Sequence, residues 1–241
     1  MSHRFIRNEL LLGKDVVEKL NKTKVMVFGL GGVGGYAVEA LARLGVGHLI
    51  ICDKDKVDLS NLNRQIIALE STLGESKVDI FKERLKDINP NIKVDGIDEF
   101  FDESKTYLFD KYKPDFVIDA IDTITPKWSL IKTCLDRNIT FVSCCGMANK
   151  INPLEIELTT LDKTSVDPIC KILRNLARKE GYDLSKINVV FSKEIPIKQN
   201  QIINESGTTR KERIPPSSII LVPSNAGLVC AYFVMDKIIN S

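Results

Sequence analysis

The fold of this chain is decided by the stretch VMVFGLGGVGGYAVEALARLG at residues 25–45. A run of apolar residues leads into a glycine-rich turn, and an amphipathic helical pattern follows the turn. Residues 29–34, GLGGVG, fit the pattern G-x-G-x-x-G, in which glycines let the backbone approach a phosphate. The helix after the turn adds N–H groups and the positive end of a dipole. We therefore predict a nucleotide site with four glycines in it: Gly29, Gly31, Gly32 and Gly34.

Strand patterns alternate with helical patterns over the first 150 residues. A short helical region is predicted at about 7–20. Strands are predicted at 24–29, 48–53, 93–97, 116–120 and 140–144, and helices at 32–44, 75–88, 103–112 and 126–137. The rest predicts an antiparallel-type strand at 154–159, a helix at 168–179, a strand at 188–192, a mobile loop at 198–216 and a helix at 224–239. This order predicts an α/β fold. We expect a Rossmann-like, mostly parallel sheet with helices on both faces, a smaller mixed or antiparallel C-terminal part and a returning C-terminal helix.

The composition is that of a globular protein. The 241 residues are 44% hydrophobic and 27% charged. The length suits one large α/β domain or one domain with a sizeable insert. With 34 basic and 32 acidic side chains the net charge is +2, so the chain is no general polycation. Between residues 163 and 213, however, eleven basic side chains stand against six acidic ones. That segment predicts either a local basic surface or a solvated helix face.

Several features favour a cytoplasmic protein without a membrane span. The opening MSHRFIRNELLLGKD carries charges throughout and lacks the apolar core of a signal peptide. The most apolar run, residues 219–235, is interrupted by Pro223, Ser224 and Asn225 and predicts a buried helix. None of the six cysteines forms C-x-x-C, so the sequence predicts no zinc ribbon, and a reducing compartment is the simplest setting. The neighbours Cys144 and Cys145 are predicted to be core residues, with a reactive pair as the alternative.

Charged residues after the second predicted strand indicate which nucleotide is bound. Asp53 ends that strand, 24 residues after Gly29, where a carboxylate can accept hydrogen bonds from ribose hydroxyls. Arg64 in SNLNRQ and Lys77 in GESKV can reach a triphosphate over the glycine turn. A reaction at an ATP phosphate needs such cations, because negative charge builds on oxygens as pyrophosphate leaves. The predicted ATP site therefore adds these residues to the turn: Asp53, Asp55, Asn61, Arg64 and Lys77.

A pair of carboxylates follows the fourth predicted strand in DAIDTITPK. Asp119 and Asp122 lie where the strand ends, and the carboxyl ends of parallel strands face the ligand crevice. Carboxylate oxygens can hold Mg²⁺ against phosphate oxygens. Either of these carboxylates could hold the ion, and ATP with Mg²⁺ is the predicted cofactor pair.

Taken together, these motifs resemble the ubiquitin-activating-enzyme-like superfamily, which includes the adenylyltransferases of molybdopterin and thiamine synthesis. The matching residues are RFIRNELLLG, GLGGVG, the Asp53 strand end, SNLNRQ, GESKV and AIDTITPK, over residues 4–146. The resemblance implies ATP-Mg²⁺ at the glycine turn and a carboxylate activated as an acyl-adenylate. It implies catalytic roles for Arg64, Lys77 and Asp122, with Asp122 binding or orienting Mg²⁺. Arg7 looks like the family arginine that reaches into the partner's site, which implies a homodimer.

The second half resembles the tRNA threonylcarbamoyladenosine dehydratase branch of this superfamily. The segments LTTLDKTSVDPICKILRNLARKEG and VVFSKE carry this likeness, which extends over nearly the whole chain. It implies one adenylating domain over 1–241, with an ATP-binding part at 1–150 and a crossover, substrate and dimerisation part at 151–241. The predicted reaction is ATP-dependent dehydration of N6-threonylcarbamoyladenosine next to the anticodon of a tRNA. Candidate tRNA contacts on the basic helix are Arg174, Arg178 and Lys179.

Other interpretations stay open at this stage. Sulfur-carrier adenylyltransferases commonly carry paired C-x-x-C motifs, which this chain lacks. Some members of the dehydratase branch place a cysteine before the last helix, where this chain reads LVPSNAG. A cysteine desulfurase partner therefore stays an open alternative that this segment does not support. A nicotinamide-dependent dehydrogenase and a non-catalytic nucleotide sensor are the further alternatives. Of the two histidines, His3 and His48, neither lies in a catalytic setting, and His48 is predicted at a strand edge.

Overall fold

Seven strands form one sheet in the computed structural model, which describes residues 3–201, 203, 206 and 214–240. The strand order is β3-β2-β1-β4-β5-β7-β6, and every neighbouring pair is parallel except the antiparallel pair β7–β6. The strands are β1 (Lys24–Phe28), β2 (His48–Cys52), β3 (Lys93–Ile97), β4 (Phe116–Asp119), β5 (Thr140–Cys144), β6 (Ile156–Thr160) and β7 (Asn188–Ser192). The predicted mostly parallel sheet with an antiparallel C-terminal addition is confirmed.

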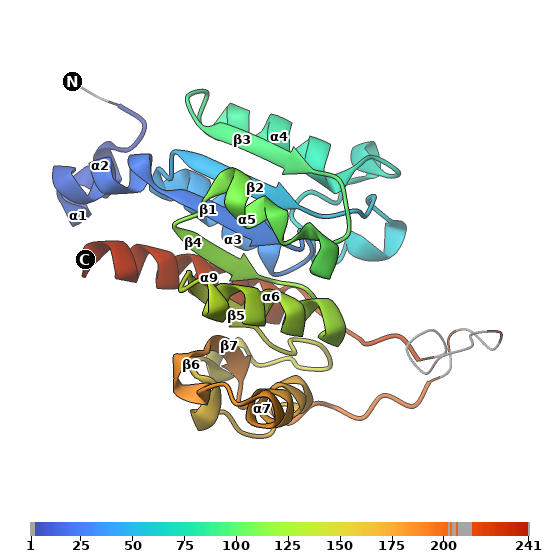
Figure 1. Cartoon of the computed structure of the whole chain (residues 1–241). Coiled ribbons are helices and arrows are strands. Elements are labelled where there is room, and N and C mark those ends of the chain that lie inside the picture. Colours follow the sequence, from blue (N-terminus) through green and yellow to red (C-terminus); the bar gives the residue numbers. More distant parts are fainter. Residues whose placement is uncertain (1–2, 202, 204–205, 207–213, 241) are drawn as a thin grey trace.

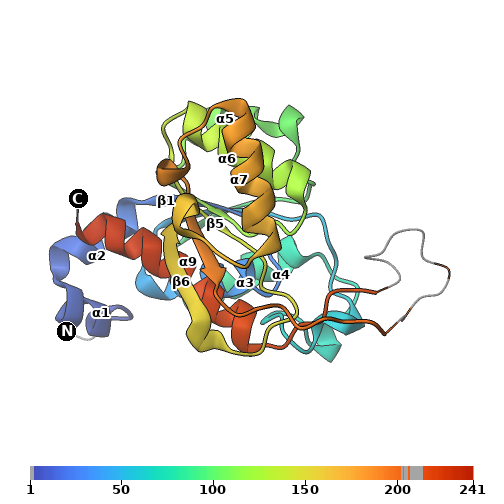
Figure 2. The ribbon, with the colours of Figure 1, turned by 90° about the horizontal axis from the view of Figure 1, so that it is seen from below.

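Helices cover both faces of the sheet and give three layers (Figure 1, Figure 2). One face carries α3 (Gly34–Leu44), α4 (Lys77–Ile88) and α9 (Leu221–Ile239). The other face carries α5 (Tyr107–Tyr112), α6 (Ile124–Asp136) and α7 (Pro168–Glu180). Successive strand residues point to opposite faces, so each layer of helices closes its own hydrophobic cluster. The neighbours Cys144 and Cys145 illustrate this, since they belong to different clusters.

The predicted N-terminal helical region at 7–20 consists of two helices. The structure has α1 (Ile6–Leu12) and α2 (Lys14–Lys22), which meet at Gly13. Gly13 has a φ of +88°, a conformation that side-chain-bearing residues avoid, so the helix cannot continue through it. The predicted helical region is confirmed, and this single glycine divides it into two helices.

The last helix returns across the sheet face, as predicted, but begins three residues earlier. It starts at Leu221, with Pro223 in its first turn, where the missing N–H has no intrahelical partner to lose. The predicted loop at 198–216 falls partly outside the described residues, and its described residues lie outside helices and strands. Among the described residues, no helix combines the length and apolarity needed to cross a bilayer.

A buried ion pair joins α6 to the ends of β4 and β5. The Nζ of Lys127 lies 2.7 Å from Oδ2 of Asp119, and both side chains are almost completely buried. The ammonium also donates to Oγ of Ser143 and to the carbonyl oxygen of Cys144. Burial opposes the charge on Lys127, but the attraction of Asp119 prevails and raises the pKa of this lysine. Lys127 therefore stays charged inside the fold.

Replacing Lys127 by alanine should destabilise the protein strongly. Lys127→Ala leaves the Asp119 carboxylate buried without its cation, and we expect the free energy of unfolding to fall by about 3–5 kcal/mol. The measurement is equilibrium unfolding in urea. The control is Lys132→Ala on the same helix, whose ion pair with Glu180 is partly exposed and contributes at most about 1 kcal/mol. Equal losses in the two variants would contradict the role assigned to Lys127.

Candidate active site

A cavity of about 620 Å³ opens at the carboxyl ends of β1, β2 and β4. This is the switch point of the sheet, since the order runs through β2 on one side of β1 and through β4 on the other. Ligands of open α/β sheets bind at such a point. Most of the predicted site residues line this cavity: Gly29, Gly31, Gly32, Asp53, Asp55, Asn61, Arg64, Lys77 and Asp122.

The predicted glycines differ in what surrounds them. A Cβ added to Gly34 would lie 1.8 Å from the carbonyl oxygen of Gly29, and one added to Gly29 would lie 2.7 Å from that of Ala120. These two glycines are needed because backbone meets backbone. A Cβ added to Gly31 would lie 3.8 Å from its nearest neighbour, Nε2 of Gln65, so the space beside Gly31 is part of the cavity. Gly34 is not among the described residues that line the cavity, and its part in the site is to let β1 and α3 meet.

Asp53 shapes the turn as well as facing the cavity. Its Oδ2 accepts a hydrogen bond from the N–H of Leu30 at 2.6 Å, and its Oδ1 accepts from the N–H of Asp55 at 2.8 Å. The carboxylate is thereby held between the glycine turn and the start of the next loop. A ribose hydroxyl can donate to the remaining lone pairs of both oxygens.

The loop that carries Arg64 is fixed by its own polar side chains. Asp58 caps the short helix at Leu59–Asn61 by accepting from the N–H of Ser60, and the side chain of Asn61 accepts from the N–H of Asp58. Nη1 of Arg64 donates to the carbonyl oxygen of Ser60 at 2.6 Å. The guanidinium therefore has a defined position on the cavity wall.

Lys77 projects from the first turn of α4. It is 4% exposed, and its Nζ lies 3.2 Å from Oδ2 of Asp55, whose side chain is exposed. The N–H of Lys77 also donates to the carbonyl oxygen of Asp55. A positive side chain and the positive end of a helix thus face the same cavity, which suits a phosphate.

The two carboxylates after β4 have different surroundings. Asp119 has both oxygens engaged, with Oδ1 accepting from the N–H of Ile121 and Oδ2 accepting from Lys127 and Ser143. Asp122 is exposed at the cavity rim, where Oδ1 accepts from the hydroxyl of Thr123. Mg²⁺ is commonly held by one or two carboxylates together with substrate phosphates. Asp122 fits that requirement, and Asp119 does not.

Sequence reasoning missed several residues of the cavity wall, and two of them have informative contacts. Gln65 is 7% exposed and lines the cavity, and its buried Oε1 has no hydrogen-bond partner. Its position within SNLNRQ was the available signal. Pro223, from the first turn of α9, lies so close to the turn that a Cβ on Gly32 would be 3.2 Å from it. No local pattern at Pro223 indicates that contact, because the two residues are 191 positions apart in sequence.

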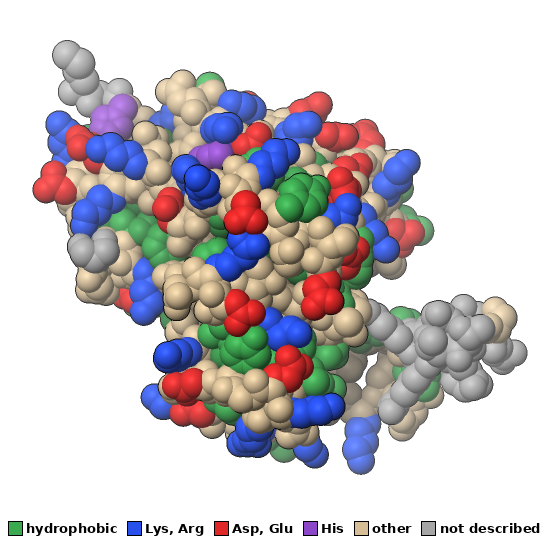
Figure 3. Space-filling view, viewed as in Figure 1, with side chains coloured by type: hydrophobic (Ala, Val, Ile, Leu, Met, Phe, Trp, Pro, Cys, Tyr) green, Lys and Arg blue, Asp and Glu red, His purple; other side chains and the backbone are tan. Residues whose placement is uncertain are grey.

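The remaining predicted residues lie outside the cavity. Arg7 is exposed on α1, beyond the amino ends of the parallel strands, whereas the cavity is at their carboxyl ends (Figure 1). Arg178 and Lys179 are exposed in the last turn of α7. Arg174 is partly buried and donates to the carbonyl oxygen and the hydroxyl of Thr164, which ties its guanidinium to the protein. In the space-filling view, basic side chains with acidic ones among them cover this part of the surface (Figure 3).

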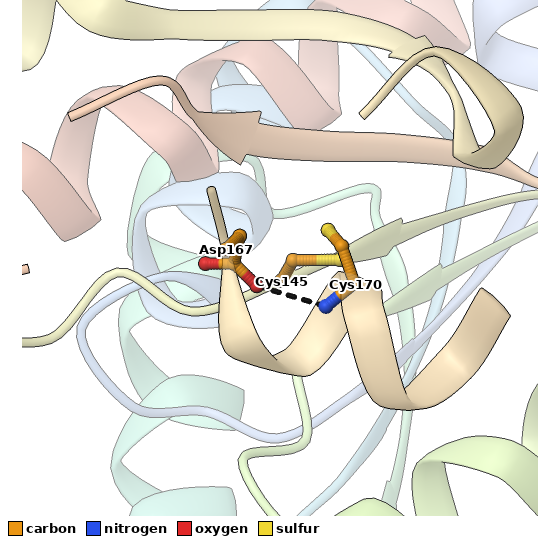
Figure 4. Close-up of side chains that lie close together, drawn as sticks. All are labelled: Cys145, Asp167 and Cys170. Carbon is orange, nitrogen blue, oxygen red and sulfur yellow. Dashed lines mark hydrogen bonds between the residues drawn. The ribbon is translucent and has the colours of Figure 1, made fainter. Parts of the chain in front are cut away.

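A buried cluster of Cys145, Asp167 and Cys170 lies on the α7 side of the sheet (Figure 4). Its donor atoms are close enough to hold a metal ion. The carboxylate is already engaged, however: Oδ1 of Asp167 accepts from the N–H of Cys170 at 2.9 Å, and Oδ2 lies 3.1 Å from Nζ of buried Lys150. The hydrogen bond to Cys170 and burial raise the pKa of the Cys145 thiol. Asp167 thus caps the start of α7, and the two cysteines contact each other in the core, so the cluster has a structural explanation without a metal ion.

The chain is similar in sequence and in fold to known proteins. A sequence profile described as the ThiF family matches residues 5–157. Over 98% of its length the chain is 45% identical to a tRNA threonylcarbamoyladenosine dehydratase of Bacillus subtilis, 95% of which is covered. It is 33% identical to a molybdopterin-synthase adenylyltransferase of Escherichia coli, covering 72% of this chain and 68% of that protein. Crystal structures of E. coli tRNA N6-threonylcarbamoyladenosine dehydratase with ATP and with AMP match with a TM-score of 0.87 and 30% identity, over 98% of this chain and 94% of theirs.

Two glycine substitutions should separate packing from nucleotide binding. We expect Gly34→Ala to lower the free energy of unfolding by about 1–3 kcal/mol or more, because its methyl group collides with the backbone at Gly29. We expect Gly31→Ala to leave stability near that of the wild type but to weaken ATP binding about tenfold, because its methyl group occupies the phosphate side of the cavity. Urea unfolding and calorimetric titration with ATP-Mg²⁺ measure the two effects. A large loss of stability in Gly31→Ala, or a loss of ATP affinity with unchanged stability in Gly34→Ala, would contradict these two roles.

Proposed function

The chain belongs to the ThiF family, and on this premise we propose that it dehydrates N6-threonylcarbamoyladenosine next to the anticodon of tRNA, at the expense of ATP. The observation that carries the proposal is a cavity at the switch point that brings together the glycine turn, Asp53, Arg64, Lys77 and Asp122. The near full-length likeness to a dehydratase supports the choice of substrate.

The reaction proceeds in two steps. The carboxylate of the threonylcarbamoyl group attacks the α-phosphorus of ATP, and pyrophosphate leaves. A nitrogen of the same modification then attacks the activated carboxyl carbon, AMP leaves, the nitrogen loses its proton and a ring closes. The net change in the nucleoside is the loss of one water. Because the second step is intramolecular, holding the two groups in place supplies a large part of the rate.

Residues of the cavity have separate roles in this scheme. Asp53 accepts hydrogen bonds from the ribose, and Gly31 leaves room for the phosphates. The backbone of Gly32 lines the same cavity beside Pro223. Arg64 and Lys77 neutralise the charge that develops as pyrophosphate leaves. Asp122 would hold Mg²⁺, which supplies further positive charge to the phosphate oxygens when bound.

A second copy of the chain completes this proposal. The outer face of α9 and the face of α1 present apolar side chains that are each more than 40% exposed: Leu10, Leu11, Leu221, Leu228, Tyr232 and Ile239. Exposed apolar surface of this kind marks an interaction site. We propose that these faces meet in a homodimer and that Arg7 of each copy serves the cavity of the other.

We propose that exposed basic side chains at the end of α7 bind the tRNA backbone. Arg178 and Lys179 are exposed there, whereas Arg174 is engaged with Thr164 and is a weaker candidate. We propose that residues 1–150 supply most of the ATP site and that residues 151–241 supply surfaces for tRNA and for the second copy. A reducing cytoplasm suits the six cysteines, all of which are free and buried.

Threonylcarbamoylated tRNA tests the proposed reaction directly. Incubation with ATP and Mg²⁺ should yield a nucleoside that has lost one water, detected by mass spectrometry after digestion of the tRNA. Lys77→Ala and Asp122→Ala should keep the fold and lower AMP formation by roughly two orders of magnitude. An intact substrate with no such product would refute the proposal. The alternative, adenylation of a sulfur-carrier protein, rests on the likeness to the molybdopterin-synthase enzyme and predicts pyrophosphate exchange with that carrier instead.

Mixing two inactive variants tests the shared site. If Arg7 acts in the partner's cavity, Arg7→Ala and Lys77→Ala should complement each other, because half of the sites in a mixed dimer are then intact. We expect roughly a quarter of wild-type AMP formation from an equal mixture. Each variant alone gives the baseline, and a mixture no better than that baseline would contradict an arginine supplied in trans.

A further inference from the structure

The described ends of the segment between β7 and α9 are held together by Asn149. Its carbonyl oxygen accepts a hydrogen bond from the N–H of Ile197 at 2.7 Å, and its N–H donates to the carbonyl oxygen of Ser217 at 2.8 Å. Its side-chain Oδ1 accepts from the N–H and the hydroxyl of Ser217 at 2.9 and 2.8 Å. We call the pair Ile197 and Ser217 the neck. One residue thus joins both sides of the neck.

Asn149 is itself well supported. The next residue, Lys150, is buried, and its Nζ contacts Asp167 and donates to the carbonyl oxygens of Gly146 and Ser192. The carboxylate of Glu194 accepts from the N–H groups of residues 151 and 152. The loop that carries Asn149 is therefore fixed to the ends of β5 and β7, and the neck is fixed to that loop.

A short path of hydrogen bonds leads from the neck to the cavity. Ser218 follows the neck directly, and its carbonyl oxygen accepts from Nδ2 of Asn63 at 2.9 Å. Oδ1 of the same Asn63 accepts from Nη1 of Arg64 at 2.9 Å. The amide of Asn63 therefore lies between the neck and the guanidinium that faces the cavity.

The start of α9 contacts the glycine turn by a second route. Pro223 packs on Gly32, and a Cβ added to Gly227 would lie 2.2 Å from the carbonyl oxygen of Val33. The backbones of α9 and of the glycine turn are therefore in direct contact. The segment that leaves the neck is held on one side by Asn63 and on the other by the turn.

We propose that Asn149 is a positioning residue of the nucleotide site. It holds Ser217, which fixes the carbonyl group of Ser218, and Asn63 transmits that position to the guanidinium of Arg64. The inference deepens the proposed function, on which it rests for the presence of ATP in this cavity. It assigns to a residue outside the cavity a part in setting the affinity for ATP.

The test compares two substitutions of Asn149. Asn149 has a φ of +60°, which glycine adopts freely and aspartate tolerates. Asn149→Gly removes Oδ1 and keeps the backbone bonds, so we expect the dissociation constant of ATP-Mg²⁺ to rise about three- to tenfold. Asn149→Asp keeps an acceptor for Ser217 and should restore the wild-type constant. Isothermal titration calorimetry gives the constants, and thermal unfolding of each variant confirms that it is folded.

Two further variants separate this path from a general loss of structure. Asn138→Gly makes the same substitution at another asparagine with positive φ, two residues after the end of α6, and should leave ATP binding unchanged. Asn63→Ala breaks the path at an exposed residue, so it tests the proposal even if Asn149→Gly fails to fold. It should weaken ATP binding as Asn149→Gly does, and the double variant should be no weaker than the single ones.

Several results would overturn the inference: unchanged ATP affinity in Asn63→Ala or in folded Asn149→Gly, no recovery in Asn149→Asp, or additive losses in the double variant. The dehydration assay on threonylcarbamoylated tRNA is separate. A wild-type protein that binds ATP but forms no dehydrated nucleoside would refute the proposed reaction. The titrations would still decide the role of Asn149.

Discussion

The buried ion pair between Lys127 and Asp119 fixes the edge of the sheet on which the site is built. The three N–H donors of the ammonium find three acceptors, in Asp119, Ser143 and the carbonyl group of Cys144. A buried charge without such partners is strongly unfavourable, so the ends of β4 and β5 and the start of α6 must keep this arrangement. The turn they enclose, residues 120–123, places Ala120 against Gly29 and Asp122 at the cavity rim. The position of the predicted Mg²⁺ residue thus depends on an interaction outside the cavity.

Most of the fold could be predicted from local patterns. Apolar runs of about five residues predicted the strands, and the glycine turn predicted how β1 enters α3. The break at Gly13 was missed because glycine is tolerated inside helices, and only the observed φ of +88° shows that this one ends a helix. The early start of α9 was missed because Pro223 was interpreted as an interruption, whereas a proline is acceptable in the first turn.

The site could be predicted in part, because its residues follow strand ends and begin a helix. Asp53, Lys77 and Asp122 occupy such positions, which parallel topology brings to one edge. The separate roles of Gly31 and Gly34 could not be predicted, because they depend on which atoms approach in three dimensions. The hydrogen bond from Arg174 to Thr164, which leaves that arginine less available to a ligand, could not be predicted either. The same is true of the contact between Pro223 and the glycine turn. Contacts between distant segments leave no periodic signal in a single sequence.

The surroundings of the cysteine at the cavity favour chemistry by positioning over covalent catalysis. Cys52 is the one cysteine among the described residues that line the cavity. Its thiol donates a hydrogen bond to the carbonyl oxygen of Glu99. Burial, together with the nearby carboxylate of Asp53, raises the pKa of Cys52 to about 12. Nucleophilic attack requires the thiolate, which is therefore scarce at neutral pH. Cations and backbone N–H groups around a nucleotide suit activation of a carboxylate, and ring closure then needs a nucleophile that the substrate itself carries.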